Sequence, residues 1–164
     1  MRLLATSEVV YVDDTDRHWR FTLSAMNVLA RGMYEQLYLT AAREWFVAAI
    51  GKTPEAVIQS YTAAKAEQRD ISRQEQYEYN LTDSVFGWAM ILASITRLEV
   101  SQDDGATFTE VDVPEDWKTP DGMMEGMKRD LYFELSVQGY KLNQDVLFDP
   151  TDEHQKKRGV IRSI

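Results

Sequence analysis

Three stretches of the 164-residue sequence hold residue types that could do chemistry, and the first is Gly51-Lys52-Thr53. This stretch resembles the end of a phosphate-binding loop, in which backbone amides and a lysine hold phosphate groups. Such a loop needs a glycine five residues earlier, where this chain has Phe46, and a strand before it, where the apolar spacing predicts a helix. We therefore interpret the stretch as the end of one helix and the start of the next.

The second stretch is Asp103-Asp104-Gly105, whose carboxylates are of the type that binds calcium. An EF-hand loop built on this glycine would need an oxygen-bearing side chain at position 100 and a glutamate at position 111. The chain has Val100 and Val111 there. We interpret the stretch as a solvated hairpin turn.

The histidines are the remaining candidates for catalysis or metal binding. His18 and His154 lie at opposite ends of the chain, and neither has metal-ligating residues at helical spacing, so we expect both at the surface. The chain has no cysteine, which excludes disulfides, thiol catalysis and Cys-ligated metal sites. We expect a protein that is not an enzyme and that needs no cofactor.

The distribution of charge is more informative than any of these motifs. The chain has 27 acidic and 18 basic residues, and from Glu99 to Glu125 nine acidic residues stand against Lys118 alone. A surface of one sign attracts a basic partner, and an aromatic residue within it is typical of an interface anchor. Two alternatives stay open: the acidic residues only keep the chain soluble, and Trp117 holds its loop onto the core. The candidate partner-binding residues are Asp103, Asp104, Glu110, Asp112, Glu115, Asp116 and Trp117.

The spacing of apolar residues predicts the elements that position these groups. Alternation at period two on both sides of a polar turn predicts a β-hairpin, and steps of three and four predict helices. In the second hairpin we expect Phe108 opposite Val100, across a loop that contains Gly105. In chain order the expected elements are a hairpin over 9–23; a helix that begins after Thr22 or Ser24, is interrupted near Gly32 and is capped by Gly51; a helix from Pro54, capped by Thr53, to about Arg69; a helix from Ser72, with a Ser72–Glu75 capping box, to Ile95; a hairpin over 98–113; a loop over 114–120; and a last helix from Pro120 to Gly139.

These elements predict an α+β fold that is mainly α, with about four helices and two short β-hairpins. Trp88 lies in the most apolar helix and should be buried, as should Met124 and Met127, whereas we expect Met123 to be exposed. Residues 1–148 should form a single globular domain, and residues 149–164 a basic, weakly ordered tail. No segment has the roughly 18 consecutive apolar residues of a membrane span, so we expect a cytoplasmic protein without membrane association.

The order of elements suggests a family. A strand that ends in Arg-Phe-Thr-Leu at 20–23 is followed by a helical region. The last helix of this region ends in the stretch Ile91–Val100. A short acidic hairpin, the loop Val113–Trp117 and a final helix that ends near Leu142-Asn143 follow. Over most of residues 8–143 this arrangement resembles the small tail assembly chaperones of tailed bacteriophages. The resemblance implies a non-enzymatic protein of the bacterial host cytoplasm that binds the long, helical tape-measure protein and keeps it soluble while the tail tube forms.

Two functional hypotheses from different classes follow. The first is the chaperone, which needs apolar grooves with a charged rim and no catalytic group. The alternative is an acidic inhibitor that imitates DNA and occupies the basic channel of a host nucleic-acid-binding or defence protein. Both hypotheses predict a protein partner and no direct contact with nucleic acid, because the net charge of -9 opposes binding to phosphates. Salt distinguishes them, since a DNA mimic should lose affinity steeply as ionic strength rises.

Overall fold

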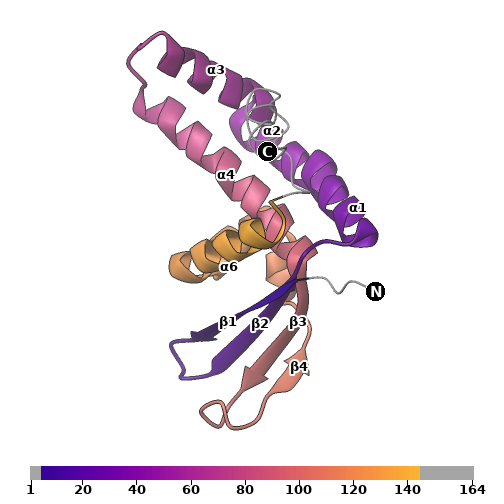
Figure 1. Cartoon of the computed structure of the whole chain (residues 1–164). Coiled ribbons are helices and arrows are strands. Elements are labelled where there is room, and N and C mark those ends of the chain that lie inside the picture. Colours follow the sequence, from indigo (N-terminus) through magenta and orange to yellow (C-terminus); the bar gives the residue numbers. More distant parts are fainter. Residues whose placement is uncertain (1–4, 145–164) are drawn as a thin grey trace.

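The computed structural model describes residues 5–144, and within them the chain has the predicted helix-rich α+β fold. In Figure 1 the strands lie at one end of the molecule, the α3–α4 hairpin extends to the other end, and α6 lies between the two. The domain boundary that we predicted at residue 148 and the tail over 149–164 lie outside the described residues.

The two predicted hairpins are both present, but they form one antiparallel sheet rather than two separate units. The strand order is β1-β2-β3-β4, because β2 of the first hairpin pairs with β3 of the second. This pairing aligns Val9, Phe21, Leu98 and Val111 in one row on the face that packs against the helices. A two-stranded hairpin alone is marginally stable, and joining the pairs supplies the missing neighbour. The strands are β1 (Thr6–Val12), β2 (His18–Ser24), β3 (Ile95–Ser101) and β4 (Thr109–Val111).

The expected pairing of Phe108 with Val100 is wrong, because the loop between β3 and β4 is longer than we predicted. Val100 pairs with Thr109 instead, and Phe108 lies before β4 with the Arg20 guanidinium 4.1 Å from its ring centroid. The loop turns through two left-handed residues, Asp104 with φ 56° and Gly105 with φ 85°. Gly105 therefore takes the backbone conformation that we expected, although in a wider turn.

The first helix is continuous and does not break at Gly32. It comprises α1 (Val28–Gln36), a π-helical turn η1 (Leu37–Ala42) and α2 (Arg43–Ile50). It begins later than we predicted, because Thr22 and Ser24 belong to β2 and Asn27 is the cap, accepting the Ala30 N–H at 2.8 Å. Gly51 ends the helix with φ 83°, as expected. Its buried side consists of Tyr34, Tyr38, Ala42 and Phe46.

The next two helices, α3 (Pro54–Ala66) and α4 (Arg73–Ser94), form an antiparallel hairpin whose start signals were predicted correctly. Thr53 Oγ1 accepts the Ala56 N–H at 3.1 Å, and Ser72 and Glu75 form the expected capping box. The second half of α4 is buried from residue 85 to residue 91. Trp88 at its centre has an exposed fraction of 0%, which confirms the prediction for this residue.

The last predicted helix is two helices, α5 (Pro120–Gly126) and α6 (Arg129–Leu142), which follow a short 3-10 turn η2 (Glu115–Lys118). The change of direction turns Met123 into the core, so the expectation that Met123 is exposed is wrong. Gly139 does not end α6. Its backbone packs against Met90, whose Sδ would lie 2.0 Å from a Cβ at this position. The glycine therefore serves a close approach of α6 to α4 rather than a helix end.

Candidate protein-binding surfaces

The predicted acidic residues gather at the β4 edge of the sheet and in the segment that follows it. Asp103 and Asp104 lie in the β3–β4 loop, and Glu110 lies in β4. Asp112 follows β4, and Glu115 and Asp116 lie in η2. All six are exposed, so the structure places the predicted carboxylates at the surface along this segment.

Several acidic side chains of this region are already used by the fold. Asp103 accepts hydrogen bonds from the Ser101 hydroxyl and from the Thr107 backbone and hydroxyl, which lower the pKa of Asp103 to about 2. Glu99 is buried beside Arg20, whose guanidinium donates two hydrogen bonds to it at 3.1 and 2.9 Å. Glu115 binds Lys118 at 2.6 Å. The exposed carboxylates outside these contacts are those of Asp104, Glu110, Asp112 and Asp116.

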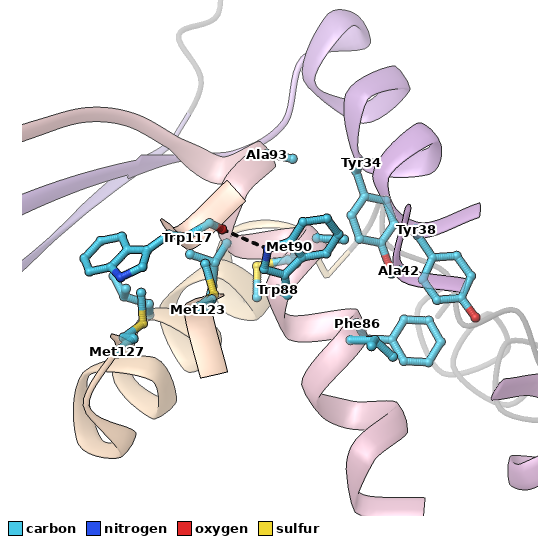
Figure 2. Close-up of a cluster of buried hydrophobic side chains, with 14 of the residues drawn as sticks. Tyr34, Tyr38, Ala42, Phe86, Trp88, Met90, Ala93, Trp117, Met123 and Met127 are labelled. Carbon is cyan, nitrogen blue, oxygen red and sulfur yellow. Dashed lines mark hydrogen bonds between the residues drawn. The ribbon is translucent and has the colours of Figure 1, made fainter. Parts of the chain in front are cut away.

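Trp117 is part of the core, with an exposed fraction of 9%. Its ring stacks on Phe21 with the centroids 6.0 Å apart, and its backbone carbonyl accepts a hydrogen bond from Nε1 of Trp88 at 2.9 Å (Figure 2). Of the two roles that the sequence left open, this packing supports the one in which Trp117 holds its loop onto the core. A ring packed against Phe21 in this way is not available for insertion into a partner.

Sequence reasoning missed the exposed apolar side chains of the first helix. Val28 and Leu29 have exposed fractions of 88% and 84%, and Met33 and Leu39 are also exposed. Leu29 and Met33 are four residues apart, so they lie on one face of α1. Large exposed apolar side chains that cluster in this way mark interaction surfaces. The signal in the sequence was a second set of apolar positions outside the buried stripe.

A groove between α4 and α6 was also missed. It has a volume of about 540 Å³, and Phe133, Val137 and Tyr140 of α6 line it at steps of four and three residues. Its floor is formed at Gly87, where a Cβ would lie 2.0 Å from the Tyr132 hydroxyl oxygen. Phe133 has an exposed fraction of 66%. The spacing was visible in the sequence, but these residues lie on the side of α6 opposite to the buried Leu131 and Leu135.

The floor of this groove is fixed by Tyr132. Its hydroxyl donates a hydrogen bond to the backbone carbonyl of Ser84 at 2.8 Å, which joins α6 to α4. Burial raises the pKa of Tyr132, so its hydroxyl remains protonated and able to donate this hydrogen bond above its ordinary titration range. The groove therefore has the Tyr132 ring in its floor and Phe133 and Tyr140 beside it, and the charged residues of its lining are Asp83 and Lys141. The aromatic part of this surface suits an apolar helix face.

The residues that resembled chemical motifs serve the fold. Lys52 donates to Glu78 Oε1 at 2.9 Å, and hydrogen bonds from Gln74 and Lys52 lower the pKa of this buried glutamate. His18 is half-buried rather than on the open surface, with Nε2 4.0 Å from Asp104, whereas His154 lies outside the described residues. Over residues 5–144 no group of three or more His, Asp or Glu side chains could hold a metal ion. No helix in this part of the chain is long and apolar enough to cross a membrane.

Comparison of the chain with protein-family models, with curated proteins and with solved structures finds no match.

Proposed function

We propose that this protein acts by binding another protein, as a tail assembly chaperone that keeps the long, helical tape-measure protein of a bacteriophage in solution. The observation that carries the proposal is the groove between α4 and α6, with Phe133, Val137 and Tyr140 along one side. Grooves of this kind take the apolar face of an amphipathic helix, whose anchors repeat at three and four residues. The family resemblance supports the same activity, because the client of such chaperones is a long helix.

The binding free energy that the groove can supply fits a chaperone that binds its unassembled client transiently. Fully burying one large apolar side chain contributes roughly 1.5 to 3 kcal/mol. Covering Phe133 and Tyr140 would therefore supply a few kcal/mol, part of which is offset by the cost of association. Such a complex releases its client when the tail tube assembles. The net charge of -9 keeps the complex in solution and favours a client helix with basic residues.

A second candidate, the acidic DNA mimic, is favoured by one observation. Four exposed carboxylates lie along the segment from the β3–β4 loop to η2, namely those of Asp104, Glu110, Asp112 and Asp116. A protein that occupies a basic channel through these groups would lose affinity steeply with salt. A chaperone complex held by apolar contacts would lose little.

The test is a pull-down from the native host with a Phe133→Asp variant. Tyr77→Asp is the matched control, because Tyr77 is an exposed aromatic residue of α4 outside the groove, with an exposed fraction of 55%. We expect the native chain and the control to retain a long, helix-rich protein, and the Phe133 variant to lose it. Capture of a nuclease or polymerase that is released by moderate salt and is indifferent to Phe133→Asp would overturn the chaperone proposal in favour of the DNA mimic.

A further inference from the structure

A second cavity lies between the inner face of the first hairpin and the start of α6. Its volume is about 270 Å³, and it shares no lining residue with the α4–α6 groove. The walls come from three separate parts of the chain. They are Tyr11, Trp19 and Phe21 of the hairpin, Trp117 of η2, and Met127 and Leu131 at the end of α5 and the start of α6.

These walls are held in place by contacts among the lining residues and by Arg17. Nε1 of Trp19 donates to Asp13 Oδ2 at 2.9 Å, and Arg17 lies over the ring of Trp19 with its guanidinium carbon 5.4 Å from the centroid. Phe21 is fully buried and stacks on Trp117. A cavity whose walls keep their shape binds a ligand without the cost of ordering side chains.

One hydrogen-bond donor of the wall is unused. No residue of the described chain accepts a hydrogen bond from Nε1 of Trp117, and this nitrogen is not among the buried polar atoms that lack a partner, so it stays accessible. A Cβ on Gly126 would lie 3.6 Å from this nitrogen, and Gly126 lines the cavity. Figure 2 shows the indole nitrogen on the side of the ring that faces Met127, another lining residue. The free N–H therefore lies on the cavity side of Trp117.

The charges at the mouth indicate a neutral ligand. Asp13 already accepts hydrogen bonds from Thr15, Arg17 and Trp19, and Asp14 Oδ2 lies 3.0 Å from Nζ of Lys128. Arg17 pairs with Asp13 and Lys128 pairs with Asp14, so the two negative and two positive charges at the mouth balance and favour neither a cation nor an anion.

We propose that this cavity binds a neutral aromatic ring system of one or two fused rings, which accepts a hydrogen bond from Nε1 of Trp117. The size agrees, since an apolar cavity of roughly 150 Å³ holds one benzene ring. The walls of aromatic side chains, methionine and leucine provide stacking and apolar contacts. The ring belongs either to a small molecule or to an aromatic side chain of a partner, because both present the same chemistry.

The test follows the indole N–H resonances of the full chain by NMR during titration with two probes. Quinoline is a neutral fused ring with one acceptor nitrogen, and naphthalene has the same shape without the acceptor. We expect quinoline to shift the Trp117 indole resonance and to bind about threefold to tenfold more tightly than naphthalene. Trp117→Phe keeps a ring and removes the donor, so it should abolish that preference, which is then followed on the indole resonance of Trp19, another lining residue.

A second variant fills the cavity. A side chain at Gly126 would enter it at ordinary contact distance, so Gly126→Leu should weaken quinoline binding at least tenfold. Gly32→Leu is the matched control, because a Cβ at Gly32 would meet nothing within 4 Å and this substitution should change nothing. N-acetyl-tyrosinamide tests the other source of the ring: binding of this probe but not of quinoline assigns the site to a partner's side chain. If neither quinoline nor N-acetyl-tyrosinamide shifts the Trp117 resonance, the proposal is wrong. It is also wrong if Gly126→Leu leaves the binding of the probe unchanged.

Discussion

Asn143 joins the end of α6 to the end of α4 and to the segment between β2 and α1. Its replacement should destabilise the protein strongly. This buried side chain accepts the Met26 N–H at 2.6 Å and donates to Gly139 O at 2.8 Å and to Ser94 Oγ at 3.3 Å. Asn143→Ala removes three hydrogen bonds, each with a net contribution of about 1 kcal/mol, and leaves the Met26 N–H without its acceptor. We expect a loss of about 3 kcal/mol in the free energy of unfolding. For a chain of this length that loss lowers Tm by roughly 9 °C.

Urea unfolding followed by far-UV circular dichroism measures this loss, with the free energy extrapolated linearly to water. Asn80→Ala is the matched control, because Asn80 is an exposed residue of α4 that accepts one hydrogen bond from Gln76. Its effect should stay within about 0.5 kcal/mol. If Asn143→Ala costs less than about 1 kcal/mol, the three elements do not depend on this side chain and the reasoning is refuted.

Three further predictions concern the core, the pH dependence and the acidic surface. Trp88→Ala should cost about 3 to 5 kcal/mol in urea unfolding, and a loss below about 1 kcal/mol would contradict its place in the core. Arg69 lowers the pKa of Glu75 to about 2 from 4.5, so the ionised carboxylate stabilises the fold above pH 4.5 and this contribution is lost as the pH falls toward 2. The stability gap between the native chain and Glu75→Gln should therefore narrow over that range, and a constant gap would disprove the coupling. Replacing three exposed carboxylates by lysine changes the net charge by +6, from -9 to -3. The substitutions should slow association with a basic partner without changing the dissociation rate. An unchanged association rate would show that the acidic surface only aids solubility. These carboxylates are Asp104, Asp112 and Asp116, since Asp103 is needed by its loop.

Features that depend on neighbouring residues could be predicted from the sequence. The caps at Thr53 and Ser72 and the left-handed end at Gly51 are determined by hydrogen bonds and backbone angles within a few residues. The burial of Trp88 followed from a helix that is apolar nearly all round. In each case the local pattern and the tertiary structure agree, and the prediction was therefore correct.

Features set by distant contacts could not be predicted in the same way. Gly139 carries the local signal of a helix end, but it is a glycine because Met90 of α4 packs against its backbone. The joining of two hairpins into one sheet depends on pairing between residues about 80 positions apart, such as Arg20 and Glu99, for which one sequence contains no signal.

In the candidate site, too, locally determined features could be predicted and features set by distant contacts could not. The acidic residues are at the surface because charged groups avoid burial, which composition predicts. Trp117 is an aromatic residue within an acidic stretch, which is typical of an interface anchor, but its ring stacks on Phe21 of the same chain. The apolar spacing of Phe133 and Tyr140 could be recognised as a binding surface only when α4 was known to lie beside α6.

Site-specific photo-crosslinking tests the central claim, which is that the α4–α6 groove binds a helical protein client. A benzophenone amino acid is placed at position 133 of the full chain in its native cells, and in a parallel culture at position 77, an exposed aromatic position outside the groove. We predict that irradiation joins the chain to one long, helix-rich protein from position 133 and not from position 77. The account is contradicted if position 133 gives no crosslink, or if both positions give the same products.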